Sequence, residues 1–315
     1  MLTDNENSEI DAFDVYMRKG EFLRRLRELE LQDEAERAAQ EDSSSPENSD
    51  AVVKTSAGQQ IFIYETFLAD QRYYDDSKHV NYKYIDYGTL GTSSPLVMEQ
   101  DHRLGKGGLC WDAAFILGEY VESVWKDHPL LPNKSFIELG SGTGLAGLMV
   151  AKALNVHVTM TDLPELMPLL QRNIARNLPQ MELDTKNLDE VYWEYMGGEA
   201  SSSSGCHDSR GSATASVLCW GNKEQEKSHG TFDVIIGADL VASLYDPYAL
   251  ADTVFHLCHN QSKVYISFKE RQTEYHVMFE TAMRQQFSKL EILLPNSRNA
   301  NPEVKILVAE SKNLS

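Results

Sequence analysis

The glycine-rich segment Ser135–Gly147 constrains the fold of this chain more than any other feature. Its sequence, SFIELGSGTGLAG, runs from a short apolar stretch to an acidic residue and then to three glycines at every second position. A glycine-rich turn that follows a strand usually holds a ligand, because glycine allows the backbone to approach the ligand closely. The question is whether this ligand is a dinucleotide, a nucleoside triphosphate or a compound without phosphates.

Apolar stretches typical of strands alternate with amphipathic stretches on both sides of this segment. The expected strands are residues 135–140, 156–162, 232–239 and 263–270, and the expected helices are residues 145–154, 165–177, 247–258 and 274–287. Two last strands, residues 289–294 and 304–310, follow without a helix between them. This order predicts an α/β fold with a mostly parallel sheet, helices on both faces and a final hairpin that adds an antiparallel edge strand.

The N-terminal region has a different composition. Residues 1–50 hold 15 acidic and 6 basic residues and end in a serine-rich linker. Within them Phe22, Leu26 and Leu29 fall at i, i+4 and i+7, which predicts a helix with one apolar stripe.

Two further segments complete the predicted organisation. Residues 59–67 and 82–88 have the residue types of strands and belong to an N-terminal extension, residues 51–110. The serine- and glycine-rich residues 197–216 predict a low-complexity surface insertion.

The composition argues against several classes of partner. The formal net charge is -19, and nucleic acids and anionic membranes attract clustered Lys and Arg instead. We expect no signal peptide, and no apolar run approaches the roughly 18 residues of a membrane span. The four cysteines form no close pair, so we expect neither a metal site nor a disulfide framework, and reduced thiols indicate the cytosol or the nucleus. The oligomeric state stays open.

The residues after the last glycine help to separate the possible ligands. A nucleoside-triphosphate loop requires Lys and then Ser or Thr at this point, whereas Gly144 is followed by Leu145 and Ala146. A dinucleotide fingerprint requires G-x-G-x-x-G, and the last position counted from Gly142 holds Leu145. Because Gly147 lies a little further along, a dinucleotide is disfavoured but stays open.

A ligand that carries a carboxylate and an amine suits the segment better. Backbone N–H groups at the start of the next helix can bind a carboxylate, and Glu138 is placed to attract an ammonium group. Asp162 ends the following strand, at the edge where ligands of open α/β sheets bind, and its carboxylate can accept both hydroxyls of a ribose. An Asp at the end of a strand caps the following helix about as often as it binds a ligand. Together, however, ELGSGTG and TD at this spacing indicate S-adenosylmethionine.

These motifs resemble those of the seven-β-strand methyltransferases, and specifically the family 16 lysine methyltransferases that act on valosin-containing protein and on heat-shock chaperones. The likeness is carried by residues 108–122, 135–154, 158–177, 217–221 and 232–247. It implies a Rossmann-like seven-stranded sheet and a methyltransferase domain over residues 111–315. It also implies a protein substrate methylated on lysine, with S-adenosylmethionine as the cofactor.

The resemblance assigns the cofactor contacts to particular residues. They are Trp111, Gly140, Ser141, Gly142, Asp162, Trp220 and Ala238, in addition to Glu138. Trp111 of the WDAA motif would flank the methionine end of the cofactor, Asp162 would hold the ribose, and Trp220 would pack near the adenine. Without the resemblance, core packing is the simpler explanation for both tryptophans.

One segment departs from the family pattern. The family has Asp and Tyr in a D-x-x-Y motif that faces the amine, and here Asp239 is present while Ala242 occupies the Tyr position. Tyr245 follows one helical turn later. We assign Asp239 as the catalytic residue, because methyl transfer to lysine needs a neutral amine aligned with the methyl group, and a carboxylate can orient the ammonium and guide its deprotonation.

The consequences of this departure leave alternatives open. Lys269, Glu270 and Arg271 follow the next strand near the same rim, as substrate contacts or as a solvated strand end. The sequence predicts a cytosolic protein-lysine methyltransferase. The alternatives are a methyltransferase that acts on a small molecule or on histidine, and a non-catalytic module that binds the cofactor and docks partners through its acidic N-terminal helix.

Overall fold

The computed structural model describes residues 51–54, 58–70, 80–92, 94–178, 211–243, 245–269, 273–299 and 301–312. The predicted helix around Leu26 and residues 197–210 of the predicted insertion lie outside this part of the chain. Residues 48–315 form one compact unit, so the predicted extension and the predicted methyltransferase domain lie in the same unit.

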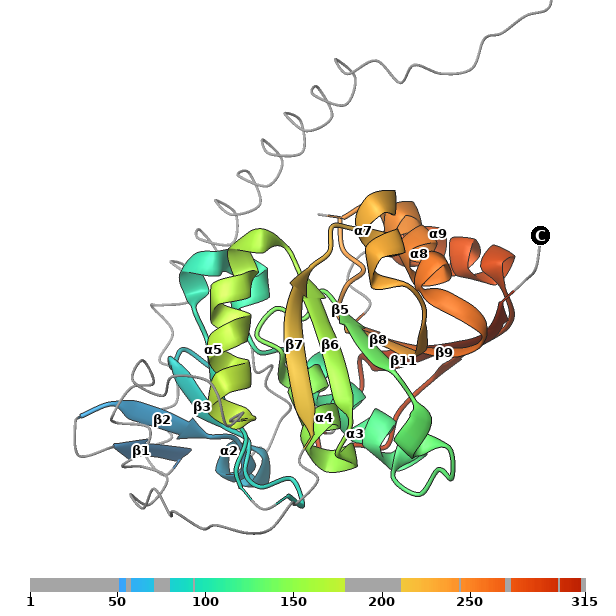
Figure 1. The fold of residues 1–315 in the computed structure, drawn as a ribbon. Coiled ribbons are helices and arrows are strands. Elements are labelled where there is room, and N and C mark those ends of the chain that lie inside the picture. The colour runs from blue at the N-terminus through green and yellow to red at the C-terminus, as the bar shows by residue number, and fades with distance from the viewer. Residues whose placement is uncertain are drawn as a thin grey trace, which may run out of the picture. The chain divides into compact units, whose positions relative to one another are not determined.

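A seven-stranded sheet, in the order β10-β11-β9-β8-β5-β6-β7, forms the centre of this unit (Figure 1). Its strands are β5 (Phe136–Leu139), β6 (His157–Asp162), β7 (Ser212–Val217), β8 (Phe232–Ala238), β9 (Cys258–Lys269), β10 (Phe287–Leu293) and β11 (Val304–Lys312). Five of them, β7, β6, β5, β8 and β9, pair in parallel, and β11 pairs antiparallel with both β9 and β10. The predicted α/β fold with a mostly parallel sheet is confirmed.

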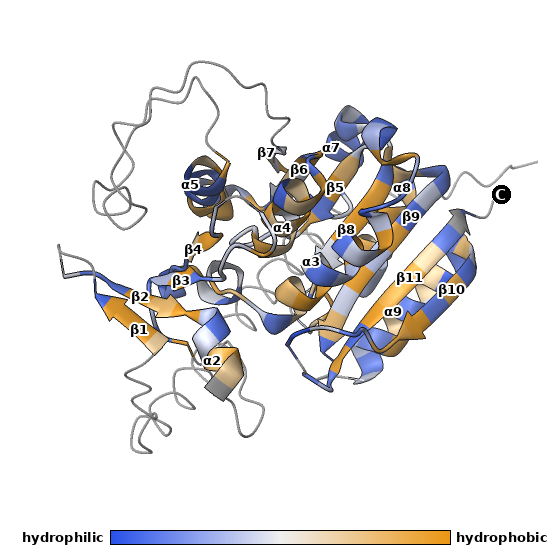
Figure 2. Ribbon diagram, turned by 90° about the horizontal axis from the view of Figure 1, so that it is seen from below, coloured by the Kyte–Doolittle hydropathy of each residue, from blue (hydrophilic) through white to orange (hydrophobic). Residues whose placement is uncertain are grey.

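Helices cover both faces of this sheet. Helices α3 (Asp112–Trp125), α4 (Leu145–Leu154) and α5 (Met167–Asn177) lie on one side, and α7 (Lys223–His229), α8 (Pro247–Leu257) and α9 (Thr273–Gln286) lie on the other. Successive residues of a strand point to opposite faces. In β8, Val234 and Ile236 therefore join the core with α3 and α4, while Ile235 joins the core with α8 and α9. Strands β5, β8 and β11 are coloured largely as hydrophobic in Figure 2.

A second sheet of four strands, in the order β1-β2-β3-β4, precedes the large one. Its strands are β1 (Val52–Lys54), β2 (Gln60–Ile63), β3 (Tyr84–Asp86) and β4 (Val97–Glu99), and the short 3₁₀ helices η3 (His102–Gly108), η4 (Leu131–Asn133) and η5 (Pro164–Leu166) lie further along the chain. The strand predicted over residues 82–88 is confirmed as β3.

The strand predicted over residues 59–67 is only partly right. Strand β2 ends at Ile63, and the chain continues as helix α2 (Tyr64–Asp70). The reason is the spacing of the apolar residues, because Tyr64, Phe67 and Leu68 fall at i, i+3 and i+4 and all contact the core.

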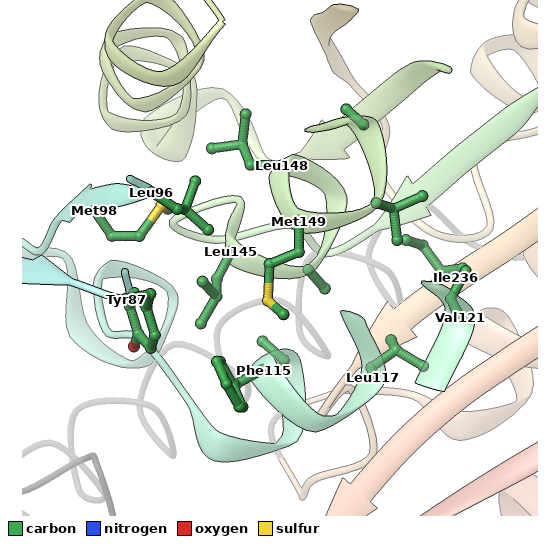
Figure 3. Packing of buried hydrophobic residues seen from close by; sticks show 14 of the residues in the cluster. Tyr87, Leu96, Met98, Phe115, Leu117, Val121, Leu145, Leu148, Met149 and Ile236 are labelled. Carbon is green, nitrogen blue, oxygen red and sulfur yellow. The ribbon is translucent and has the colours of Figure 1, made fainter. Parts of the chain in front are cut away.

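The two sheets share a hydrophobic core. Tyr87 and Met98, from the region of the small sheet, belong to the same buried cluster as Phe115 of α3 and Leu145 and Met149 of α4 (Figure 3). Helices α3 and α4 approach closely at Gly118, where an added Cβ atom would lie 2.7 Å from the sulfur of Met149. The small sheet is therefore packed directly against the helices that flank the glycine-rich segment.

The final hairpin adds an antiparallel edge strand as predicted, because β10 lies at the edge of the sheet and pairs antiparallel with β11. Within the hairpin, β11 inserts between β9 and β10. Burial explains this order, because Ile306, Leu307 and Ala309 of β11 are at most 1% exposed, whereas most of β10 is exposed or half-buried. The more apolar strand takes the position that is covered on both sides.

The predicted end of the low-complexity insertion is also wrong. Residues 212–217, most of which we had included in the insertion, form β7, which pairs in parallel with β6 from His157 to Asp162. In the sequence SATASV, Ala213, Ala215 and Val217 alternate with Ser and Thr, and Ala213 is buried while the other two pack against the core. Backbone pairing with β6 and these small apolar contacts are sufficient for an edge strand.

Candidate functional site

A loop at the end of β5 brings three glycines into a conformation that suits glycine alone. Gly140, Gly142 and Gly144 have φ values of 56°, 53° and 90°, a region that other residues adopt only with strain. The Ser141 N–H donates to the Thr161 carbonyl at 2.9 Å, and the Gly144 N–H donates to the Ser141 carbonyl at 2.7 Å. We call residues 140–144 the glycine loop. It turns over the ends of β5 and β6 and leads directly into α4.

The structure places Asp162 against this loop. Its carboxylate accepts the backbone N–H of Gly142 at 2.6 Å and that of Leu163 at 2.7 Å. Burial raises the pKa of Asp162, and these two N–H donors offset only part of the effect. An ionised carboxylate has about four acceptor positions, so two remain for further donors such as ribose hydroxyls.

The alternative that Asp162 caps a helix is not favoured by these contacts. The next helical segment, η5, begins after Leu163, which is its N-cap and makes no side-chain capping bond. Asp162 instead bonds to the glycine loop, as a ligand-binding arrangement at this edge requires.

Glu138 lies beneath the loop rather than on its surface. Its side chain is 2% exposed, and its Oε2 atom has no hydrogen-bond partner among the described residues. Burial raises the pKa of Glu138 to about 8, while Ser141 and the Gly147 backbone oppose this only in part. A direct contact with an ammonium group, as the sequence suggested, does not fit this burial. The position fits support of the loop and of the first turn of α4.

Two aromatic rings flank the other side of the loop. A Cβ atom on Gly140 would lie 3.1 Å from the ring of Trp220, and this ring meets that of Tyr245 edge-on with centroids 5.1 Å apart. Burial raises the pKa of Tyr245 to about 12, and the charges of Asp162, Glu165 and Asp239 act in the same direction. Tyr245 therefore lies near both Asp162 and Asp239. The sequence analysis noted Tyr245 but did not assign it to the site.

Asp239 follows the end of β8 in a strained conformation. Its φ is 55°, and only two other non-glycine residues in the described chain have a positive φ. Such strain tends to persist at functional positions. The Asp239 N–H donates to the Ser267 carbonyl at 2.8 Å, and its carboxylate accepts the Lys269 N–H at 3.2 Å. Ala238 immediately precedes it, next to the end of β5.

Of the three residues predicted at the rim after β9, the structure describes only Lys269. Lys269 forms an ion pair with Glu303, and Glu270 and Arg271 lie outside the described residues. The ion pair ties Lys269 to the start of the last strand.

Trp111 lies at the start of α3, next to a segment that covers the glycine loop. Its indole Nε1 donates to the Lys106 carbonyl at 2.9 Å, and Lys106 belongs to η3. A Cβ atom on Gly142 would lie 2.7 Å from the carbonyl oxygen of Gly107, so η3 packs directly on the loop. Sequence reasoning missed this role of η3. The adjacent pair Gly107-Gly108 was the available signal.

The predicted residues at the carboxyl ends of β5, β6 and β8 come together, because Leu139 pairs with both Thr161 and Gly237. The predicted site residues that are half-buried, and so accessible from this edge, are Trp111, Gly140, Asp162, Trp220, Ala238 and Asp239. Ser141 and Gly142 are buried within the loop. The donors and acceptors of this edge fit a cofactor with hydroxyl groups, a carboxylate and an aromatic base.

Other kinds of site were also sought in the part of the chain that the structure describes. There, no group of three or more His, Cys, Asp or Glu side chains is placed to hold a metal ion. None of the helices described is at once long and apolar enough to cross a membrane.

The sequence is similar to those of known proteins. The lysine methyltransferase family model matches residues 91–203 and 202–286. The EEF1A lysine methyltransferase 3 of Xenopus tropicalis is 30% identical over 221 residues, which is 70% of this chain and 82% of that protein. The protein N-lysine methyltransferase METTL21A of Danio rerio is 31% identical over 62% of this chain and 76% of its own length, and that of Mus musculus is 32% identical over 58% and 72%. The chain therefore belongs to the lysine methyltransferase family and is an enzyme whose methyl donor is S-adenosylmethionine.

Proposed function

We propose that this chain methylates a lysine side chain of a protein substrate at the carboxyl edge of β5, β6 and β8. The observation that carries the proposal is the arrangement of two carboxylates around one loop. Asp162 is bonded to the glycine loop, Asp239 follows the adjacent β8, and Tyr245 lies near both. One carboxylate is thus available for the cofactor and the other for the acceptor.

The cofactor side of the site consists of the glycine loop, Asp162 and the two tryptophans. In this proposal Asp162 uses its remaining acceptor positions for the ribose hydroxyls, and backbone N–H groups at the start of α4 receive the carboxylate. Trp220 packs against the adenine and Trp111 flanks the methionine end. When bound, S-adenosylmethionine supplies an electrophilic methyl group.

The acceptor side is built around Asp239. Its carboxylate receives the lysine ammonium, orients it and accepts its proton as a general base, so that a neutral amine faces the methyl group. Positioning is the main requirement, because the sulfonium needs little help from acids or bases. The strained backbone of Asp239 is consistent with a carboxylate held in one direction.

Tyr245 supplies the aromatic surface that Ala242 lacks. The Tyr245 N–H donates to the Ala242 carbonyl at 3.1 Å, so the chain turns after Asp239 and brings Tyr245 back toward the site. We propose that its ring, packed on Trp220, forms a wall of the acceptor channel.

The substrate is proposed to be a protein. One relative, the EEF1A lysine methyltransferase 3, carries the name of its substrate, so EEF1A is the first purified protein to test. Valosin-containing protein and a heat-shock chaperone follow from the sequence resemblance. We also propose a cytosolic or nuclear location, since the cysteines that the structure describes, Cys110, Cys219 and Cys258, form no disulfide.

The proposal is tested by methyl transfer from labelled S-adenosylmethionine into a cell lysate and into these purified proteins. We expect label in discrete protein bands, methyl-lysine in their digests, and little label with the Asp239→Asn variant. Label only in small molecules, or in histidine, would support the other acceptor classes. Cofactor binding without any transfer would support a non-catalytic module.

A further inference from the structure

Asn173 of α5 connects the small sheet to the glycine loop. Its side chain is fully buried. The Oδ1 atom accepts the Glu99 N–H at 2.8 Å and the Arg176 guanidinium at 3.0 Å. The Nδ2 atom donates to the Glu99 carbonyl at 3.0 Å and to the Thr143 carbonyl at 2.9 Å. A carboxamide has two donors and two acceptor positions, so every one of them is used.

Asn177, one turn later on the same helix, makes a matching pair of bonds with β4. Its Oδ1 atom accepts the Val97 N–H at 2.8 Å, and its Nδ2 atom donates to the Val97 carbonyl at 2.8 Å. Four helical residues rise about 6.0 Å, and two strand residues span about 6.6 Å. The two amides therefore match alternate residues of β4 and replace a neighbouring strand along this edge.

The two asparagines differ in one respect. Asn173 also reaches the glycine loop, whereas Asn177 bonds only to β4 and to the carbonyl of Asn173. Thr143, the loop residue that Asn173 holds, is 3% exposed. Its carbonyl belongs to the same peptide as the Gly144 N–H, which donates to Ser141. Asn173 thus fixes one end of a loop peptide whose other end closes the turn.

We propose that Asn173 is a positioning residue for the cofactor. By keeping the Thr143 carbonyl turned toward α5, its amide holds the glycine loop in the orientation that receives the cofactor carboxylate. The opposite orientation would turn the Thr143 carbonyl oxygen toward the Ser141 carbonyl, which now accepts the Gly144 N–H, and would open the turn that leads into α4. The inference rests on the proposed function, in which the glycine loop binds S-adenosylmethionine.

The small sheet takes part in this arrangement. Glu99 is 5% exposed, and its carboxylate binds Arg172 at 3.1 Å and Arg176 at 3.0 Å, both on α5. Although burial opposes it, these two guanidinium groups hold the pKa of Glu99 below its ordinary value. The ion pairs keep α5 against β4, so that Asn173 stays within reach of both Glu99 and Thr143.

The test compares Asn173→Ala with Asn177→Ala, which is its matched control. Both variants lose two bonds to β4 and we expect similar losses of thermal stability. In calorimetric titration with S-adenosylhomocysteine, we expect Asn173→Ala to weaken binding about tenfold, because a buried carbonyl loses its donor, and Asn177→Ala to stay within twofold of wild type. In turnover, the KM for S-adenosylmethionine should rise for Asn173→Ala while kcat at saturation is retained.

Equal effects of the two substitutions on affinity would overturn the proposal and leave Asn173 a structural residue. Should Asn173→Ala not fold, Asn173→Asp takes its place, because its carboxylate keeps both acceptor contacts and loses both donors. An affinity of Asn173→Asp within twofold of wild type would likewise overturn it. Asp162→Ala, titrated in parallel, tests the cofactor site itself: if that variant binds like wild type, the proposed site is wrong, independently of Asn173.

Discussion

The backbone N–H of Gly142 donates to the carboxylate of Asp162, with 2.6 Å between nitrogen and oxygen. This bond joins the loop after β5 to the end of β6, two points that are 20 residues apart in the chain. It places a charged acceptor beside a loop whose φ values suit only glycine. A charged acceptor and the turn that leads into α4 are thereby held at one edge of the sheet before any ligand arrives.

Asp162→Ala should abolish most cofactor binding while the fold is kept. The ribose hydroxyls lose a charged acceptor, and each hydrogen bond to a charged group contributes about 1.5–3 kcal/mol, so affinity should fall roughly 100-fold or more. Calorimetric titration with S-adenosylmethionine measures the change, and circular dichroism checks the fold. An unchanged affinity would mean that Asp162 only organises the loop.

Glu138→Gln should make the cofactor-free protein less sensitive to alkaline pH. Burial raises the pKa of Glu138 from 4.5 to about 8, so the folded state favours the protonated form. The stability that Glu138 contributes is therefore fully present below about pH 4.5 and is lost as the pH rises through 8. Glutamine stays neutral throughout, so the variant does not lose this part of the free energy of unfolding at high pH. Each kcal/mol of unfolding free energy raises the melting temperature by roughly 2–4 °C.

Thermal unfolding at pH 5 and pH 9 measures this effect. We expect similar melting temperatures for wild type and Glu138→Gln at pH 5 and a higher one for the variant at pH 9. Glu224→Gln, on the exposed surface of α7, is the control and should follow wild type. A parallel pH dependence of Glu138→Gln and wild type would show that the buried carboxyl group does not titrate in this range.

Tyr245 should act through its ring rather than its hydroxyl. Tyr245→Phe keeps the edge-on contact with Trp220 and should retain at least half of the wild-type turnover. Tyr245→Ala removes a contact that is worth about 0.5–1.5 kcal/mol beyond its buried area and should lower kcat/KM about tenfold. Both variants are assayed on the same protein substrate. A loss in Tyr245→Phe as large as that in Tyr245→Ala would assign the role to the hydroxyl instead.

The order of strands and helices around the seven-stranded sheet was predictable, because most of the elements are marked by a local pattern in the sequence. The residues of β8 form a short apolar run, and those of α5 repeat apolar residues at helical spacing. The motif ELGSGTG marks a turn that only glycines can form. The apolar residues of β7 are small and continue a serine- and glycine-rich tract, and α2 begins within a stretch that looks like a strand, so both were misjudged. The position of β11 inside the sheet depends on its burial relative to β10, which a local pattern does not contain.

The site also has features that the sequence could predict and features that it could not. Asp162 and Asp239 were predictable, because strand ends and motifs place them at one edge of the sheet. The burial of Glu138, the contact of η3 with the loop and the contact of Tyr245 with Trp220 were not, because each depends on segments that are distant in the sequence. Asn173 looked like one polar position on an amphipathic helix, and only its contacts with Glu99 and Thr143 distinguish it.

Asp239→Asn should lower the turnover number about 100-fold, within the range of a positioned acid or base, while cofactor affinity stays within twofold of wild type. Asparagine tolerates the left-handed φ of 55°, and its amide oxygen can still accept the Lys269 N–H that now bonds at 3.2 Å. The variant therefore keeps the fold and loses only the charge. An interaction used mainly in the transition state appears in the rate and not in ground-state binding.

Ala242→Tyr, which restores the family's aromatic residue, is the complementary probe and should narrow the range of acceptors. Turnover of Asp239→Asn at the wild-type rate on an identified protein substrate would show that Asp239 is a strand-end cap, whose role is fully met by its bond to Lys269.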